Sequence, residues 1–280
     1  MKKQFLLFTL VLITANSFAQ LPNTDIWLLD MKITNDTILL KNPVNITHRE
    51  GYDNQPAFSP DGKYLLYSSI REDKKAHVYK YKLRSRRTKQ FTHTATSEYS
   101  PTFMPDGQNI SVVMVEKDSA QRLWKFPLKG GPPTVIMKDI DSIGYHCWIT
   151  KDSLAMVMTS NPPVLKLVNV NTQKNKVFAH NVGRSMAVEG VRLYHVQKPM
   201  DNFNYLYWNG DYVLQIPNED FAYFRATLPV VFTGVKSKIM VTVIPTKRNA
   251  TLLDLSSYGI KNITRIAVNK AGTKMAIVAE

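Results

Sequence analysis

The chain has little cysteine, little helical patterning and few long apolar runs. It contains one cysteine, Cys147, which excludes an intrachain disulfide framework, and the apolar neighbours of this residue favour a buried structural thiol. No stretch of twelve or more residues keeps the 3.6-residue hydrophobic period of an amphipathic helix. After a short apolar run near the N-terminus, no segment approaches the roughly 18 apolar residues that a membrane span needs. These absences favour a β-rich globular protein.

The first nineteen residues have the pattern of a secretory signal peptide. Lys2 and Lys3 form a basic start, an apolar core runs from Phe5 to Ile13, and residues 17–19 form a small-x-small cleavage site. Cleavage is expected after Ala19, which would place the mature protein in the periplasm or outside the cell. No cysteine follows this site directly, so a lipid-anchored form is not expected.

The composition is strongly basic. The net charge is +14, and loss of the two signal-peptide lysines leaves 34 basic and 22 acidic residues, or +12. A positive surface favours acidic partners, such as an anionic glycan or the acidic surface of another protein. The alternative is an ordinary solvated exterior, because Lys74-Lys75 and the run from Arg84 to Arg87 lie in or beside predicted turns. Nucleic acid is not expected as a partner of an exported protein.

One short turn motif recurs along the chain. Phe58-Ser59-Pro60-Asp61-Gly62 precedes an alternating, strand-like run, and Phe103-Met104-Pro105-Asp106-Gly107 precedes another. Proline sets its own φ and glycine adopts positive φ freely, so each motif predicts a tight reversal between two strands. Gly62 and Gly107 are 45 residues apart, a period typical of propeller blades.

Alignment on the turn extends the repeat to six members. The weaker ones are Trp148 to Ser153, Met186 to Gly190 and Val230 to Gly234, where Lys238 to Val243 is the expected second strand. The sixth, Val268 to Gly272, is clear again. Gly62 and Gly272 span 210 residues in five steps, a mean of 42, which is the size of a four-stranded blade.

The last repeat ends after its second strand, and its missing strands are found at the other end of the chain. Asp25 to Met31 reads as the third strand and Val44 to Thr47 as the fourth. Pairing the two ends would close a ring and remove free sheet edges. The predicted fold is therefore all-β, a single six-bladed β-propeller over residues 20–280 whose N-terminal strands close the last blade. The expected blades cover residues 49–93, 94–138, 139–180, 181–217, 218–261, and 262–280 with 21–48.

Three segments resemble the WD40-like (PD40-type) repeat of TolB-like propeller proteins. They are Tyr52 to Phe58, Ser97 to Phe103, and Leu123 to Gly131, together with the Ser-Pro-Asp-Gly turn. The resemblance covers the first two blades and the sixth turn. It implies a six-bladed propeller exported to the bacterial periplasm or beyond, which acts by binding. The separate α/β domain of TolB is not expected, because only a few residues lie between the predicted cleavage site and the first strand.

The sequence offers little support for catalysis. Gly183-Arg184-Ser185-Met186-Ala187 looks like a serine-hydrolase nucleophile elbow, but no buried strand followed by a helix surrounds it. Three histidines, His48, His93 and His180, lie at equivalent ends of predicted fourth strands. A ring would spread them too far apart for the roughly 2 Å bonds of one metal site. His146 lies beside an innermost strand and is the one histidine with a candidate contact role. No metal site, catalytic residue or cofactor is expected.

The remaining candidate site is the face where fourth-strand-to-first-strand loops meet the central channel. Aromatic rings and charges of both signs on this face could hold a sugar or a peptide by ring stacking and charge-assisted hydrogen bonds. The alternative is that the tyrosines pack between blades and the charges solvate the rim, since repeated positions usually serve the fold. The candidate residues are Tyr52, Asp53, Glu98, Tyr99, Tyr145, His146, Arg184, Tyr223, Arg225 and Arg265.

The function favoured by the sequence is a non-catalytic, monomeric binding or scaffold module of the bacterial cell envelope, with an envelope protein as its partner. The alternatives are a receptor for an anionic glycan and a propeller-type polysaccharide lyase or glycosidase. An enzyme would need an acid/base pair or metal ligands converging in one pocket. Glu98, Asp53, His146 and Arg184 are the candidates for that role.

Overall fold

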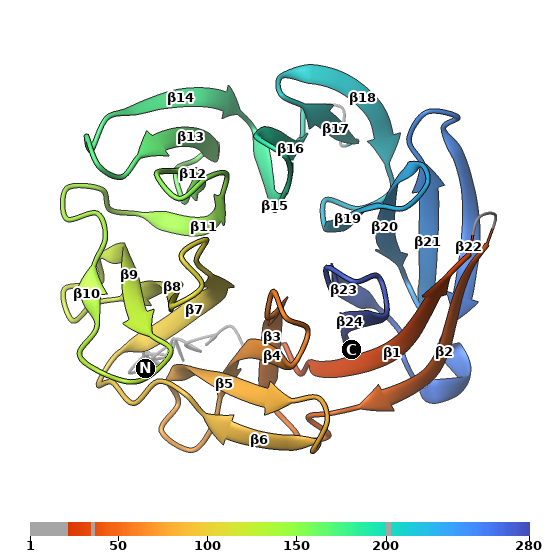
Figure 1. The fold of residues 1–280 in the computed structure, drawn as a ribbon, viewed down its shortest axis with the longest axis horizontal. Coiled ribbons are helices and arrows are strands. Elements are labelled where there is room, and N and C mark those ends of the chain that lie inside the picture. The colour runs from red at the N-terminus through yellow and green to blue at the C-terminus, as the bar shows by residue number, and fades with distance from the viewer. Residues whose placement is uncertain (1–21, 35–36, 200–202) are drawn as a thin grey trace, which may run out of the picture.

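Six four-stranded antiparallel sheets are arranged in a ring, as Figure 1 shows. The computed structural model describes residues 22–34, 37–199 and 203–280. The predicted signal peptide and its cleavage site lie outside these residues. Within the described ranges, the single helical element is the 3₁₀ turn η1 (Ser256–Tyr258), and no helix is long and apolar enough to cross a lipid bilayer. The predicted fold class, an all-β six-bladed propeller, is confirmed.

Each of the first five blades is built from four consecutive strands, numbered from the innermost outward. Blade one contains β3 (Tyr52–Phe58), β4 (Tyr64–Ile70), β5 (Ala76–Lys82) and β6 (Arg87–Gln90), and blade two contains β7 (Ser97–Phe103), β8 (Asn109–Val115), β9 (Gln121–Pro127) and β10 (Thr134–Val135). Blade three contains β11 (Ile143–Trp148), β12 (Ser153–Met158), β13 (Val164–Asn169) and β14 (Asn175–His180). Blade four contains β15 (Val182–Glu189), β16 (Arg192–Gln197), β17 (Asn204–Trp208) and β18 (Asp211–Ile216). Blade five contains β19 (Phe221–Arg225), β20 (Pro229–Val235), β21 (Lys238–Val243) and β22 (Arg248–Asp254).

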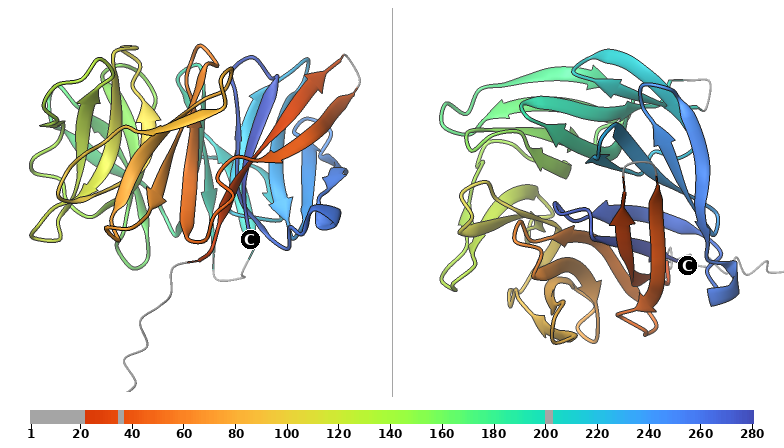
Figure 2. Two further views of the ribbon diagram at one scale, coloured as in Figure 1. Left: turned by 90° about the horizontal axis from the view of Figure 1, so that it is seen from below. Right: turned by 45° about the vertical axis from the view of Figure 1, so that its right-hand side comes forward.

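The sixth blade joins the two ends of the chain. Its strand order is β2-β1-β24-β23, where β23 (Ile263–Val268) and β24 (Lys274–Ala279) are C-terminal and β1 (Asp25–Ile33) and β2 (Ile38–Asn45) are N-terminal. Strand β1 pairs with β24 over six residues, and Figure 2 shows the red N-terminal strands beside the blue C-terminal ones. The predicted ring closure is confirmed. The fourth strand, however, ends at Asn45 rather than covering the expected residues 44–47.

The repeated turns follow from their sequence. The hydroxyl oxygen of Ser59 accepts hydrogen bonds from the backbone N–H groups of Lys63 (3.1 Å) and Tyr64 (2.9 Å), which closes the turn between β3 and β4. Gly62 has a φ of +67°, in the left-handed region that favours glycine. In the second repeat, Met104 stands at the position of Ser59, and the carboxylate of Asp106 accepts from the backbone N–H groups of residues 108 and 109 instead.

The expected register of blade five is wrong. Gly234 lies within β20 and is not a turn residue, so residues 238–243 form the third strand and residues 248–254 the fourth. The true turn joins Arg225 to Pro229 through Ala226, Thr227 and Leu228, which include none of the residues that mark a tight turn. Gly234 is needed for packing instead, because a Cβ there would lie 2.5 Å from the Cγ2 atom of Ile263 in blade six.

The core lies in the joints between blades. Leu65 and Tyr67 of β4 pack against Ile26 of the sixth blade, while Leu66, pointing to the other face of the same strand, packs against Ile110 of blade two. All four side chains from residues 26, 65, 66 and 110 are fully buried. The middle strands therefore carry continuous apolar runs, as expected for strands that are covered on both faces.

Candidate functional site

The innermost strands of all six blades line a central channel of about 340 Å³. Two of these strands are bent by equivalent bulges. Gln55 in β3 and Ser100 in β7 have positive φ values of 60° and 52°, and each is followed by a proline that faces the channel. The side-chain oxygen of Gln55 accepts a hydrogen bond from the backbone N–H of Ser100 at 2.6 Å. The pairing of β3 with β4, and of β7 with β8, shifts register at these residues. Bulges of this kind redirect the side chains beside them.

A nearly buried carboxylate lies between two arginines in the channel. The Oδ2 atom of Asp220 is 2.7 Å from the Nε atom of Arg184 and 3.6 Å from an Nη atom of Arg265. Arg184 also donates to the carbonyl oxygen of Thr264 at 2.8 Å. Burial alone would lower the pKa of Arg184, but the carboxylate of Asp220 outweighs it and the pKa is raised. The group carries a net charge of +1 with all three side chains ionised.

Tyrosines surround this charged group. Tyr145 accepts a hydrogen bond from Arg265 at 3.2 Å, and the guanidinium carbon of Arg265 lies 5.1 Å from the centre of the Tyr145 ring. Tyr52 and Tyr99 meet edge to face with their ring centres 6.5 Å apart. Burial raises the pKa of Tyr52 to about 12, although Arg265 and Arg184 act in the opposite direction. The tyrosines and the arginines therefore form one cluster.

This cluster contains one residue from each blade. We call it the channel mouth, and its members are Tyr52, Tyr99, Tyr145, Arg184, Asp220 and Arg265. Each residue lies among the first three residues of the innermost strand of its blade or immediately before that strand. Five were among the predicted site residues, although they lie in strands rather than in the expected loops. Asp220 was missed, because the wrong register of blade five hid its position directly before an innermost strand.

Glu98 lies in a joint between blades rather than in the channel. Its carboxylate is fully buried and contacts the Nδ1 atom of His77 at 3.0 Å and the hydroxyl of Thr92 at 2.8 Å, and it also accepts from Thr94. His77 and Thr92 belong to blade one and Glu98 to blade two, so the contacts tie the two blades together. A carboxylate held by three partners in this way is a structural group.

Asp53 occupies the same position in blade one and also faces a joint. Its carboxylate lies 2.9 Å from the Nε atom of Arg49, which follows the last strand of blade six. Arg49 further donates to the hydroxyl of Ser69 and to the carbonyl oxygen of Ile70. Burial raises the pKa of Asp53, and the contacts with Ser69 and Arg49 oppose this effect. Asp53 and Glu98 thus play parallel structural roles at consecutive joints.

His146 is a neutral, hydrogen-bonded histidine. It lies within β11, where its Nε2 atom is 2.7 Å from the hydroxyl of Ser111 in blade two. Trp148 donates to the same hydroxyl at 2.9 Å. Burial lowers the pKa of His146 to about 3, so the ring is uncharged at neutral pH. Beside it, burial raises the pKa of the Cys147 thiol to about 12, which keeps this thiol protonated.

Tyr223 and Arg225 lie away from the channel mouth. The structure has them in β19 itself, not in the loop before it as expected, because the blade-five register was misread. The Tyr223 ring stacks on Tyr194 with centres 4.5 Å apart, and Arg225 pairs with Glu189 at 2.6 Å. Glu189 and Arg225 are the last residues of β15 and β19, so this pair marks the opposite end of the innermost strands.

The remaining chemistry-bearing residues are dispersed. Ser185, in the elbow-like motif, lies within the strand β15, and its hydroxyl accepts from the backbone N–H of Phe221 at 3.4 Å. Within residues 22–34, 37–199 and 203–280, no three His, Cys, Asp or Glu side chains are grouped so as to hold a metal ion. The four candidates for catalysis do not converge: Glu98 and Asp53 lie in two different joints, His146 contacts blade two, and Arg184 pairs with Asp220.

Comparison with solved structures identifies the class of fold. A protein assigned as TolB from Agrobacterium tumefaciens superposes with a TM-score of 0.68 at 13% identity, covering 92% of this chain and 98% of that one. TolB from Acinetobacter baumannii gives a TM-score of 0.59 at 11% identity, covering 92% of this chain and 64% of that one. An oligogalacturonate lyase in complex with manganese is more distant, with a TM-score of 0.52 at 14% identity and coverages of 90% and 78%.

The chain is therefore a TolB-like six-bladed β-propeller in its fold. No protein-family model matches the chain, and no curated protein matches its sequence. At these identities the similarity concerns the fold alone, so the function must be argued from the residues of this chain.

Proposed function

We propose that this chain is a non-catalytic, protein-binding propeller of the bacterial cell envelope and that it binds its partner at the channel mouth. The observation that carries the proposal is the convergence of one tyrosine, arginine or aspartate from each of the six blades at a single place. Tyrosine and arginine are the residue types that contribute most to protein–protein binding, because they combine large contact areas with directed hydrogen bonds.

Binding is favoured over catalysis by the state of the acidic and basic groups. A general acid/base pair needs two groups that both reach one substrate. The carboxylates of Glu98 and Asp53 are held by residues of neighbouring blades, and the low pKa of His146 opposes its protonation at neutral pH. The channel mouth offers hydrogen-bond donors, aromatic rings and fixed charge, which suit recognition of a surface or a peptide.

The location in the envelope rests on the N-terminal sequence. The basic start, the apolar core and the small-x-small motif of residues 1–19 support export, with a mature propeller of residues 20–280. A monomer in the periplasm, or secreted beyond it, accords with the ring closure, because pairing of the two chain ends completes the sixth sheet within one copy.

The alternative, a polysaccharide lyase or a receptor for an anionic glycan, would use the same two arginines of the channel mouth. Arg184 and Arg265 could pair with carboxylates of a uronate chain. Asp220 already neutralises one of these charges, which weakens the case for a strongly anionic ligand at this position.

The proposal is tested by capture of partners from a bacterial envelope extract at low and at moderate salt. The immobilised mature protein is compared with Tyr145→Ala and Arg265→Gln variants, and Tyr212→Ala, on the exposed outer part of blade four, is the control. We expect the wild type and the control to retain one defined envelope protein at moderate salt and both channel-mouth variants to lose it. Capture of acidic polysaccharide with chain shortening, and without a protein, would contradict the proposal.

A further inference from the structure

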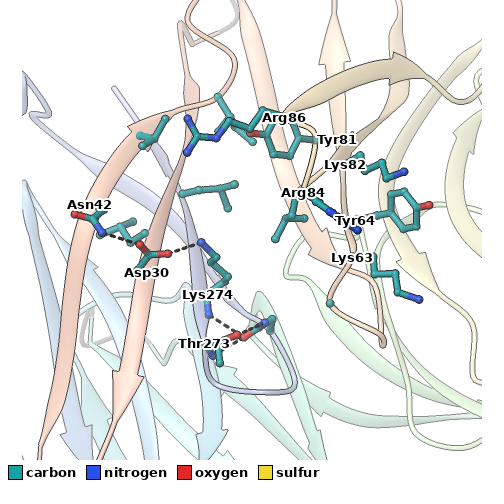
Figure 3. A pocket seen from close by; sticks show the side chains of 17 residues that line it. Asp30, Asn42, Lys63, Tyr64, Tyr81, Lys82, Arg84, Arg86, Thr273 and Lys274 are labelled. Carbon is teal, nitrogen blue, oxygen red and sulfur yellow. Dashed lines mark hydrogen bonds and ion pairs between the residues drawn. The ribbon is translucent and has the colours of Figure 1, made fainter.

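A second and larger cavity opens at the joint between blade six and blade one. It has a volume of about 770 Å³, more than twice that of the central channel. Strands β1 and β2 form one side, and β4, β5 and the turn that follows β5 form the other (Figure 3). Pockets of this size are typical of sites for small molecules. We call this cavity the joint pocket.

The joint pocket lies beside an irregularity in the closing blade. The register between β1 and β2 shifts between Leu28 and Asp30, and Asn42 on β2 has a positive φ of 52°. Pro43 follows and cannot donate a ladder hydrogen bond. A bulge bends its strand and increases the local twist, and Asn42 and Val44, on either side of Pro43, both line the cavity.

Part of the wall of the joint pocket is apolar, and the rest is polar or charged. Leu28, Val44 and Ile46 contribute from the closing blade, and Tyr81 and Leu83 contribute from blade one. Val44 is 44% exposed. Covering an open apolar wall of this kind with a hydrophobic group is favourable, because apolar surface is removed from water.

Two arginine side chains without a hydrogen-bonded partner among the described residues lie at the edge of this apolar wall. Arg84 and Arg86 both line the pocket and are exposed, and across the described chain neither guanidinium has a hydrogen bond or an ion pair. In Figure 3, Arg86 points toward the side of the cavity that carries Asp30 and Lys274. The carboxylate of Asp30 already has two partners other than Arg86, because it pairs with Lys274 and accepts a hydrogen bond from Asn42 at 2.8 Å. Lys274 and then Asn42 lower the pKa of Asp30, with a smaller contribution from Arg86.

We propose that the joint pocket binds an amphiphilic anion, a carboxylate or a phosphate carried on an alkyl chain. The anionic group pairs with the two free arginines, and the chain lies along Leu28, Val44 and Ile46. A neutral sugar chain fits less well, because it would leave the two arginines without an anionic partner and would place hydroxyl groups against Leu28, Val44 and Ile46. This site is separate from the channel mouth and does not depend on the function proposed for it.

Titration calorimetry with single-chain ligands below their micelle concentrations tests the proposal. Dodecanoate and dodecyl phosphate are compared with neutral dodecyl maltoside, and with acetate and inorganic phosphate, which lack the chain. We expect saturable binding of at least one of the two anionic amphiphiles, with all three other probes at least about tenfold weaker, the equivalent of about 1.4 kcal/mol. The relative affinities of dodecanoate and dodecyl phosphate distinguish a fatty carboxylate from a lipid phosphate as the preferred group.

Two pairs of variants assign the binding to this pocket. The double variant Arg84→Ala/Arg86→Ala removes the free guanidinium groups, and Arg248→Ala/Lys176→Ala removes two exposed cations of other blades as its control. Val44→Asp puts a carboxylate on the apolar wall, and Leu39→Asp makes the same change at a 42% exposed position of β2 outside the pocket. We expect at least tenfold weaker binding in R84A/R86A and V44D and unchanged binding in both controls. Equal affinity of each variant and its control, or no saturable binding by the wild type, would overturn the proposal.

Discussion

Gly234 of blade five lies directly against Ile263 of blade six. A Cβ atom at position 234 would lie 2.5 Å from the Cγ2 atom of Ile263 and 2.7 Å from its carbonyl oxygen. The surrounding backbone is held on both sides, since Ile263 donates to the carbonyl oxygen of Lys236 at 2.8 Å and Asn218 donates to that of Gly234 at 3.0 Å. The fit between these two blades therefore depends on the absence of a side chain at one position.

Gly234→Ala is expected to destabilise the propeller by about 2–3 kcal/mol, near the upper end of the usual cost of overpacking. The contacted carbonyl oxygen belongs to paired backbone and cannot move away easily. Smaller losses of stability are expected for Gly144→Ala and Gly183→Ala, because the atoms nearest to the added Cβ are side-chain atoms at 3.1 and 3.2 Å. Equilibrium urea unfolding of the three variants measures the effect. A Gly234→Ala protein as stable as the wild type would refute this account of the joint.

The closing strand should contribute as much stability as an internal strand of the ring. Ile26 in β1 is fully buried against blade one, so Ile26→Ala is expected to lower the free energy of unfolding by about 2–5 kcal/mol. Leu39→Ala, on the neighbouring strand and 42% exposed, should cost less than about 0.5 kcal/mol. Both values come from urea unfolding followed by tryptophan fluorescence. Similar small effects for the two variants would mean that the ends of the chain are not part of the cooperative ring.

His77 should stabilise the joint between blades one and two more strongly at low pH than at high pH. Burial alone would lower its pKa, but hydrogen bonds to Asp73 at 2.7 Å and to Glu98 at 3.0 Å outweigh burial and raise the pKa above its ordinary value. A raised pKa in the folded state means that folding favours the protonated ring. The stabilisation is fully present below the unfolded pKa of about 6.5 and is lost as pH rises through the folded value.

The difference in unfolding free energy between the wild type and His77→Gln measures this effect. It should be largest near pH 6 and shrink steadily as the pH is raised above about 6.5. His93→Gln is the control, because His93 is exposed. A difference that stays constant or grows with rising pH would show that the two carboxylates do not hold the protonated ring.

Local chemistry made most of the fold predictable. The turns at Gly62, Gly107 and Gly272 carry their own signals, because positive φ and serine, aspartate or asparagine side chains act within a few residues. The ring closure followed from counting strands, since the strands missing from the last blade were present at the start of the chain. Asn209-Gly210, in which both residues have positive φ values, is a further hairpin signal and joins β17 to β18 in blade four.

The remaining errors concern long-range contacts. Gly234 was mistaken for a turn residue because its reason for being glycine, the approach of Ile263, lies in another blade. For a related reason, the predicted site combined residues of the channel mouth with residues of the joints between blades. Adjacent strand residues point to opposite faces, so Tyr52 and Tyr99 reach the channel mouth, while their neighbours Asp53 and Glu98 face the joints. The sequence alone does not show which of two neighbours faces the channel.

The most direct test of the proposed function is site-specific photo-crosslinking in the bacterial envelope. A photoreactive phenylalanine derivative replaces Tyr145 at the channel mouth in one protein and Tyr212, which is 53% exposed on blade four, in another. We predict that the protein labelled at position 145 crosslinks to one defined envelope protein and that the protein labelled at position 212 does not. Crosslinks from position 212 alone, with none from position 145, would contradict binding at the channel mouth.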